Sequence, residues 1–250
     1  MNEINSFRQG IKDGIPIGIG YLSVSFAFGI FSVGLGLSVF EATLISLLNL
    51  TSAGQLAAAP IIASGGSIIE LILTQLVINM RYALMSVSLS QKLGDSVRVR
   101  DRFLIAHGNT DEIFAMATSK DGQVGKRYML GLMLTPVIGW TGGTLLGAIA
   151  GDVLPAVVVS ALGIAIYAML VAIVVPAARD SRPTALCVLS AIAISCEFYY
   201  VPALSSVPMG FVITFAAIAV SLIFAWVAPI SCDDDEAALE PIGEAGGHDA

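Results

Sequence analysis

Long uncharged stretches follow one another along this chain, separated by short clusters of charged and polar residues. The stretches without any charge cover residues 14–40, 42–69, 128–151, 153–178 and 198–232. Each is long enough for a membrane-crossing helix, because about 20 apolar residues span a hydrocarbon core of roughly 30 Å. Two weaker stretches are 70–91, which contains Arg81, and 183–204, which contains Glu197. The pattern predicts an all-α, polytopic transmembrane helix bundle of about seven spans.

The distribution of basic residues predicts how this bundle is oriented. Helices are expected near residues 14–37, 40–63, 67–91, 128–150, 153–178, 183–203 and 206–230. Between the third and the fourth, the polar region 92–127 holds seven of the twelve basic residues, namely Lys92, Arg98, Arg100, Arg102, Lys120, Lys126 and Arg127. Cytoplasmic loops are enriched in Lys and Arg, so this region is predicted to be cytoplasmic. Three helices before it and four after it then place the N-terminus outside and the C-terminus inside.

Residues 103–118 leave the number of spans open. The segment is amphipathic, short and polar at its centre, so it is compatible with an interfacial helix, a re-entrant segment or an eighth span. As a span it would invert the first three helices and bring the N-terminus inside. The C-terminus stays cytoplasmic in either topology. We favour the re-entrant form.

Prolines at similar positions suggest an internal repeat. Pro16 opens the first expected helix and Pro136 lies similarly in the fourth, while Pro60 ends the second and Pro176 the fifth. The offset falls from about 120 to 116 residues, which favours a 3+3 inverted repeat plus one added helix. A chance coincidence of prolines remains the alternative.

Glycines recur every four residues in the fourth expected helix, at Gly139, Gly143, Gly147 and Gly151. This spacing places them on one helix face, where small residues let a second backbone approach closely. The stripe is therefore predicted to pack against another helix.

Composition supports the membrane class and separates a tail from it. Hydrophobic residues make up 56% of the chain and charged residues only 12%, against about 25% charged in a typical soluble domain. The net charge of −7 comes largely from the C-terminus. Residues 1–231 are therefore predicted to form the transmembrane domain, and 232–250 an acidic, disordered tail.

A polar insert lies inside the uncharged run 42–69. It contains Asn49, Thr51, Ser52, Gly54 and Gln55. Such groups are unfavourable in mid-membrane unless they face protein, water or a substrate. Small residues and an amide here predict a broken helix that offers backbone groups to a ligand.

The third expected helix carries Asn79, Arg81 and Tyr82 within an apolar segment. An arginine at such a position seldom faces lipid. It either snorkels to the helix end or forms a structural ion pair, or it binds a substrate carboxylate through its fork of donors. A further option is that it pairs with an acid that becomes protonated during transport.

Three carboxylates are candidates for proton coupling or for an ion pair with this arginine. Asp111 and Glu112 follow Thr110, a pattern that also marks a helix N-terminus with a threonine cap. Glu197 lies within an apolar segment. Removal of a carboxylate from water raises its pKa, so each of these side chains is a candidate to bind and release a proton.

Motifs for other classes of protein do not occur. The sequence has no nucleophile elbow, no metal-ligand pair and no phosphate-binding loop, and no basic and aromatic cluster typical of nucleic-acid binding. The three cysteines form neither a metal spacing nor a disulfide framework. We therefore predict neither an enzyme nor a cofactor or metal site.

Three elements in this order resemble the AzlC family. They are Gly54-Gln55 in the second expected helix, Asn79-Met80-Arg81-Tyr82 in the third, and Thr110-Asp111-Glu112-Ile113-Phe114 after it. The resemblance covers about residues 6–230, and Tyr82 stands where His is frequent in the family. Its YgaZ-type members are large subunits of branched-chain amino acid exporters.

The resemblance implies a secondary transporter in the cytoplasmic membrane that exports branched-chain amino acids such as valine by alternating access. It also implies a small hydrophobic partner subunit of the AzlD type. The residues expected to receive the substrate are Asn49, Thr51, Ser52, Gly54, Gln55, Asn79, Arg81 and Tyr82. The alternatives are an amino acid uptake permease and a passive channel for small solutes.

Overall fold

The computed structural model describes residues 3–155, 157, 171, 174–176, 178–204 and 206–228. Within them the chain forms helices and two strands of two residues each. The elements are β1 (Glu3–Ile4), α1 (Phe7–Gly34), α2 (Val39–Leu48), α3 (Ser52–Ala63), α4 (Ile68–Lys92), α5 (Val99–His107), α6 (Asp111–Thr118), β2 (Gln123–Val124), α7 (Lys126–Val153), α9 (Arg182–Tyr200) and α10 (Met209–Val227). Five of these helices, α1, α4, α7, α9 and α10, are long and apolar enough to cross a membrane. The predicted all-α polytopic class is confirmed.

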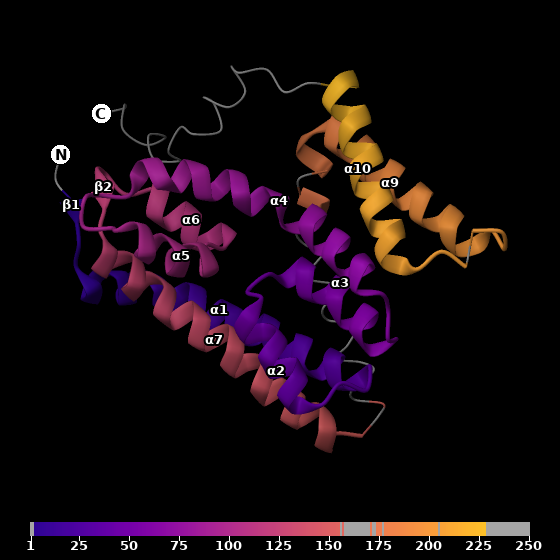
Figure 1. Cartoon of the computed structure of the whole chain (residues 1–250), viewed down its shortest axis with the longest axis horizontal. Helices are drawn as coiled ribbons and strands as arrows, with labels where there is room; N and C mark the ends of the chain where they lie inside the picture. Colours follow the sequence, from indigo (N-terminus) through magenta and orange to yellow (C-terminus); the bar gives the residue numbers. More distant parts are fainter. Residues whose placement is uncertain are drawn as a thin grey trace, which may run out of the picture.

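Helices α1 and α7 lie side by side along their whole length and run in the same direction (Figure 1). Their starts are joined by the parallel pairing of Glu3 with Gln123 and of Ile4 with Val124. The predicted glycine stripe of α7 faces α1: a Cβ added at Gly139 would overlap the carbonyl oxygen of Gly18. Such close approach of two backbones requires glycine, because any side chain would separate the helices.

The same contact continues to the far ends of both helices. A Cβ added at Gly143 would overlap the carbonyl oxygen of Leu22, and one at Gly147 that of Phe26, while Gly151 faces Val33. Glycines of α1 contribute from the other side, since a Cβ at Gly29 would overlap the carbonyl oxygen of Thr144. The two helices therefore form one continuous pair.

The uncharged run 42–69 does not form a single span. Helix α2 ends at Leu48 with Asn49 as its C-cap, and after Leu50 and Thr51 the helix α3 begins at Ser52. Helix α3 turns back toward α2, as the hydrogen bond from Gln55 Nε2 to Ser46 Oγ at 2.7 Å shows. Farther along α3, Ala59 packs against Phe28 and Leu37, beside the start of α2. The chain therefore enters and leaves at the end of the bundle where α1 ends, and the predicted helix 40–63 is wrong.

Helix α4 crosses the bundle in the direction opposite to α1. It begins after a turn at Gly65, where φ is +68°, close to the end of α3. Leu93, which caps its C-terminus, pairs with Val124 beside the start of α7.

A second hairpin, α5–α6, enters from the end where α1 and α7 begin. Near its entry, Lys126 Nζ lies 2.7 Å from the Asp101 carboxylate, and near its exit Lys120 Nζ lies 2.8 Å from that of Asp13. Between them the chain reaches inward until Thr110 meets Tyr21 of α1. Residues 103–118 thus take the re-entrant form, the alternative that we favoured.

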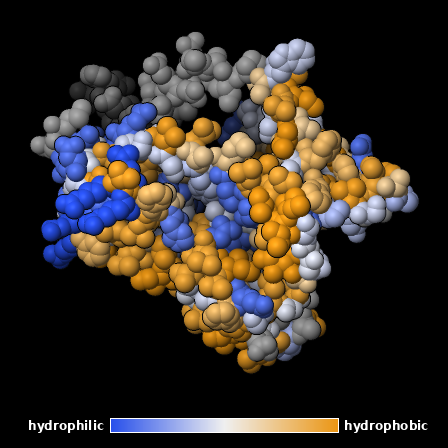
Figure 2. Space-filling model, viewed as in Figure 1, coloured by the Kyte–Doolittle hydropathy of each residue, from blue (hydrophilic) through white to orange (hydrophobic). Residues whose placement is uncertain are grey.

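These two hairpins correct the predicted repeat and the predicted orientation. Only α4 crosses between α1 and α7, so these two helices are parallel, and Pro16 and Pro136 do not belong to units of opposite orientation. The N-terminal residues Arg8 and Lys12 consequently lie at the same end as region 92–127, not at the opposite end as predicted. We call this the basic end; its basic residues are Arg8, Lys12, Lys92, Arg98, Arg100, Arg102, Lys120, Lys126 and Arg127. Figure 2 shows the strongly hydrophilic residues gathered there.

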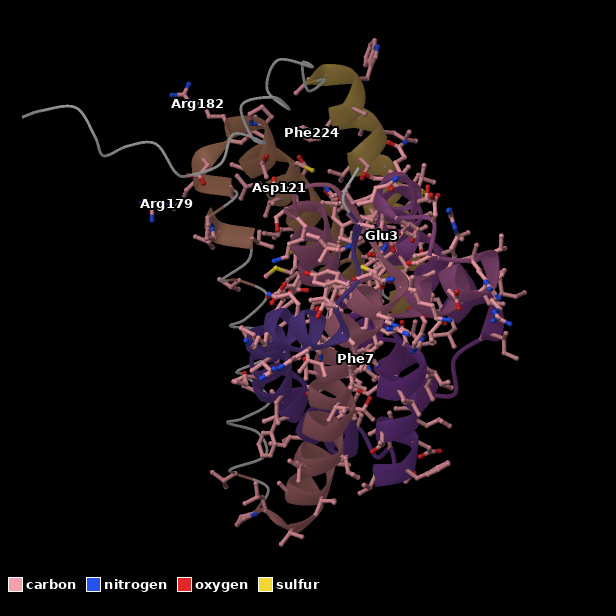
Figure 3. The ribbon with its side chains drawn as sticks, turned by 90° about the vertical axis from the view of Figure 1, so that its left-hand side faces the viewer. Glu3, Phe7, Asp121, Arg179, Arg182 and Phe224 are labelled. Atoms are coloured by element: carbon pink, nitrogen blue, oxygen red, sulfur yellow. The ribbon has the colours of Figure 1, made fainter. Side chains whose placement is uncertain are left out.

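Helices α9 and α10 form an antiparallel pair that contacts α4. The rings of Phe198 and Phe215 lie 5.8 Å apart, and the backbone N–H of Gly210, in the first turn of α10, donates to Glu70 Oε1 at 2.8 Å. Figure 3 shows Arg179 and Arg182 pointing away from the bundle near the start of α9. Most of the predicted span 153–178 lies outside the described residues, as do the predicted tail 232–250 and the domain boundary at 231.

Candidate functional site

The tips of the two hairpins meet at the same level, about midway along α1 and α7. From the α5–α6 side, Tyr21 Oη lies 2.6 Å from Thr110 Oγ1. From the α2–α3 side, Trp140 Nε1 donates to Gln55 Oε1 at 2.8 Å. The two aromatic rings contact each other edge to face, with centroids 5.0 Å apart. One aromatic pair therefore connects both tips to the α1–α7 pair.

A cavity of about 470 Å³ lies between the tips. Its walls come from α1, α4, α7 and both hairpins. They are lined by Pro16, Ile17, Gly20, Tyr21, Val24, Leu50, Ser52, Tyr82, Thr110, Asp111, Glu112 and Trp140. The walls are mainly apolar, and the charged groups among the described residues that line them are Asp111 and Glu112. This combination of apolar area and few polar groups is typical of small-molecule sites.

Two helices begin at this cavity, α3 at Ser52 and α6 at Asp111. The first backbone N–H groups of a helix have no partner within it and carry partial positive charge. Thr51 and Thr110 precede these helices with extended backbones, yet neither side chain accepts a capping hydrogen bond from the described backbone. The cavity thus has two helix N-termini on its walls. That of α6 already carries Asp111 and Glu112 in its first turn, whereas that of α3 carries no acidic residue and favours an anionic group.

The charged residues of the site form two separate sets of contacts at its rim. Arg81 Nη2 lies 2.9 Å from Asp111 Oδ2, and each side chain is about half exposed. The same nitrogen donates to Tyr82 Oη at 3.1 Å. On the other side, Tyr21 donates to Glu112. Of the roles considered for Arg81, an ion pair with Asp111 is the one present in this structure.

The predicted amides of the first hairpin lie behind its tip instead of lining the cavity. Gln55 is completely buried and bonded at both ends, to Trp140 through Oε1 and to Ser46 through Nε2. Ser46 Oγ in turn lies 2.6 Å from Thr144 Oγ1 of α7. This buried chain fixes α2 and α3 to α7, and it positions the Trp140 ring at the cavity wall.

A second polar cluster joins the same tip to α4. Asn49 Nδ2 donates to Gln75 Oε1 at 3.1 Å, and Gln75 Nε2 donates to the carbonyl oxygen of Gly54 at 2.8 Å. Asn79 also donates to Gln75 Oε1, at 3.0 Å. Gly54 is required here because an added Cβ would overlap Thr51 Oγ1 and lie 2.8 Å from Gln75 Oε1. The polar residues of the break are therefore bonded to one another and to α4, whereas the buried Asn79 Oδ1 has no hydrogen-bond partner among the described residues.

The structure sorts the candidate residues into four groups. Ser52, Tyr82, Asp111 and Glu112 line the cavity, whereas Asn49, Thr51, Gly54, Gln55 and Asn79 support the first tip. Arg81 is the ion-pair partner of a lining residue. Glu197 is exposed on α9, among residues that do not line the cavity.

Sequence reasoning missed Tyr21 and Trp140, which lie at the centre of the site. A signal was present: Tyr21 closes the segment that begins at Pro16, and Trp140 the similar segment that begins at Pro136. We interpreted these segments as a repeat of two separate units. In the parallel pair they lie side by side, so that their terminal rings meet. Gln75 and the buried Glu70 were also missed.

Within the described residues, no three His, Cys, Asp or Glu side chains gather closely enough to hold a metal ion. The polar groups of the site are instead two helix N-termini, two carboxylates and hydroxyls. Together with five potential spans and two half-membrane hairpins, these features define a multi-pass membrane transporter with a small-molecule cavity between broken helices.

The chain belongs to the AzlC family. The family described as AzlC protein matches residues 16–154, which include both hairpins and the whole cavity. The inner membrane protein YgaZ of Escherichia coli (strain K12) is 32% identical over 195 residues, covering 75% of this chain and 78% of that protein. An uncharacterized membrane protein of Archaeoglobus fulgidus is 35% identical over 172 residues, covering 68% and 75% respectively. No solved structure is significantly similar to the chain.

Proposed function

We propose that this protein is a secondary transporter that exports branched-chain amino acids such as valine by alternating access. The observation that carries the proposal is the cavity between two helix N-termini that arrive from opposite ends of the bundle. Membership of the AzlC family and the likeness to YgaZ support the class. The identity of the substrate, the direction of transport and the coupling to protons are part of what we propose.

The walls of the cavity suit the three parts of an aliphatic amino acid. Its carboxylate would be held by the N–H groups at the start of α3, which carries no acidic residue in its first turn, as in transporters with discontinuous helices. Its ammonium group would be attracted by Asp111 and Glu112. Its side chain would contact Ile17, Val24 and Leu50. The volume of about 470 Å³ lies within the range of about 300–1,000 Å³ for small-molecule sites.

Coupling to protons would act through the same carboxylates. Asp111 is paired with Arg81, so protonation of Asp111 would weaken this contact between α6 and α4. The hairpin α5–α6 would then separate from α4 and open the cavity toward the basic end. Since the positive-inside rule assigns this end to the cytoplasm, we also infer that the N-terminus is cytoplasmic. A small hydrophobic subunit of the AzlD type is the expected partner.

Counterflow in proteoliposomes tests the function. Vesicles loaded with unlabelled valine should accumulate labelled valine transiently, whereas a passive channel gives no counterflow. Asp111→Asn and Arg81→Gln should abolish the signal, and Glu197→Gln, which changes an exposed carboxylate outside the cavity, should retain it. Arg81→Lys keeps the charge without the planar fork, so its activity shows whether charge alone suffices. Wild-type counterflow by both Asp111→Asn and Arg81→Gln would contradict the proposed site.

The direction requires intact cells. Cells loaded with labelled valine, leucine, isoleucine and methionine should lose branched-chain amino acids faster when the protein is present. The assay is carried out both with and without co-expression of the small subunit. Net accumulation under the same conditions would identify an uptake permease instead.

A further inference from the structure

A second groove lies at the basic end, away from the cavity between the tips. It has a volume of about 320 Å³ and runs between the last turns of α4 and helix α5. Leu89, Leu93 and Ile105 form its apolar base, and Phe103 stands at its side with 78% of its surface exposed. Arg102 is the charged residue among its lining side chains. The groove is therefore an apolar channel with one basic group.

The position of this groove along the bundle follows from its neighbours. Its outer part is formed by Leu93 and Val99, next to the strand pairing that joins the starts of α1 and α7. Its inner part is formed by Ser86 and Ala106, which lie closer to the tip of α5–α6. The groove thus extends from the charged surface of the basic end into the apolar depth of the bundle.

The charge around the groove is positive and not compensated. The basic end carries nine basic residues against five acidic ones, which are Glu3, Asp13, Asp95, Asp101 and Asp121. Two of these acids are already engaged, Asp13 with Lys120 and Asp101 with Lys126. Arg102 is exposed and forms no salt bridge with an acidic residue that the structure describes.

We propose that this groove binds an anionic phospholipid, with one acyl chain between α4 and α5 and the phosphate at Arg102. Each part of the lipid meets the matching chemistry, since the chain covers Leu89, Leu93 and Ile105 and the phosphate receives the donors of a guanidinium. Basic pockets between helices on the cytoplasmic side of a membrane are typical sites for anionic headgroups. The bound lipid would support α5, the outer helix of the second hairpin.

Lipid retention by the purified full chain tests this proposal without reference to transport. The delipidated protein is mixed with phosphatidylglycerol or phosphatidylcholine, and the retained lipid is counted by native mass spectrometry alongside thermal stability. The wild type should retain phosphatidylglycerol preferentially and be stabilised by it. Arg102→Gln should weaken this binding about fivefold, the effect expected for one basic side chain near an anionic surface. Arg182→Gln is the matched control, an exposed arginine in the first turn of α9, and should bind as the wild type does.

Two further arms separate the lipid from other occupants. Ala106→Phe fills the groove without a change of charge and should also reduce the retained lipid, so the proposal does not depend on one variant. Soluble glycerol phosphate should not replace the lipid, and stabilisation by it to the same degree would show a simple anion site instead. Equal retention of both lipids, or wild-type retention by both Arg102→Gln and Ala106→Phe, overturns the proposal. The proposal is also overturned if Ala106→Phe retains lipid as the wild type does but no longer co-purifies with a small subunit. That result would show that a protein occupies the groove.

Discussion

The hairpins α2–α3 and α5–α6 share one design and differ in how their tips are held. In each, a long helix is followed by a short helix that reaches the middle of the bundle, a polar tip, and a helix that returns. Asn49 and Asn109 lie at the two tips, 60 residues apart, and each precedes a threonine at a helix start. Because α1 and α4 run in opposite directions, the unit α1 with α2–α3 and the unit α4 with α5–α6 form an inverted pair. This pair replaces the repeat predicted from the prolines.

The first tip is held by buried contacts. Gln55 is fully buried within hydrogen bonds that connect α2, α3 and α7, and Gln75 of α4 bonds to the same tip. The second tip also has a buried contact, since Asn109 Nδ2 donates to Ser86 Oγ of α4 at 3.1 Å, but its charged residues are held at the rim, by the half-exposed pair of Arg81 with Asp111 and by the bond from Tyr21 to Glu112. Exposed ion pairs are weak and exchange readily with water. We therefore infer that the α2–α3 tip is the fixed half of the site and the α5–α6 tip the more movable one, while the outer part of α5–α6 stays anchored through the buried Ile105 and Ala117.

Labelling of single cysteines gives the largest expected effect, because it is all or none. Leu35→Cys and Ser64→Cys, before and after the first hairpin, should react with an impermeant maleimide from the same side of the membrane. Asp121→Cys, after the second hairpin, should react from the other side. The background protein lacks Cys187, Cys196 and Cys232. Labelling of positions 35 and 64 from opposite sides would contradict the hairpin and support a single membrane-crossing helix over 40–63.

Loss of one buried amide should destabilise the protein much more than loss of one rim carboxylate. Gln55→Leu leaves the buried Trp140 Nε1 without its acceptor, at a cost of about 1–3 kcal/mol. It also removes the donor to Ser46, which keeps its contact with Thr144. Asp111→Asn breaks a half-exposed ion pair, which contributes roughly 0–1 kcal/mol. Thermal unfolding in detergent should therefore show a clear drop in midpoint for Gln55→Leu only. Equal midpoints would remove the distinction between a fixed and a movable tip.

Added bulk at the two tips should show the same asymmetry on a smaller scale. Gly54→Ala places a methyl group against Thr51 Oγ1 and Gln75 Oε1, which are already fixed by hydrogen bonds. We expect a loss of about 1–3 kcal/mol, the usual range for overpacking. Gly108→Ala meets the flexible end of Met133, which can move aside. Its unfolding midpoint should stay close to that of the wild type, and a larger loss than for Gly54→Ala would contradict the comparison.

Removal of one hydroxyl should give the smallest effect, confined to the second hairpin. Tyr21→Phe keeps the ring contact with Trp140 and deletes the hydrogen bonds to Thr110 and Glu112. A net hydrogen bond contributes about 0.5–1.5 kcal/mol, so amide hydrogen exchange over residues 108–114 should rise about 2- to 10-fold. Exchange over residues 49–55 serves as the internal control and should not change. A rise of similar size there would indicate that both tips open together.

Several features of the site followed from the sequence because they are local. The break at Asn49–Gln55, the intramembrane Arg81 and the pair Asp111–Glu112 stand out as polar groups in apolar surroundings, and all lie at or near the site. The aromatic pair of Tyr21 and Trp140 did not stand out, since an aromatic residue in an apolar helix is usually a packing residue. Its role depends on a contact between residues 119 positions apart.

What the sequence determined by itself is the class of the protein: a helical, polytopic membrane protein with uncharged spans, a glycine stripe and polar interruptions. The transfer of side chains from water to lipid fixes these features, and that free energy depends on composition alone. The direction of each segment was decided only by tertiary structure. An uncharged run such as 42–69 is equally apolar whether it crosses or turns back. It turns back here because Gln75 of α4 accepts a hydrogen bond from Asn49 and donates one to the carbonyl oxygen of Gly54 at the break. In addition, the glycines of α7 allow α1 to pack directly against α7.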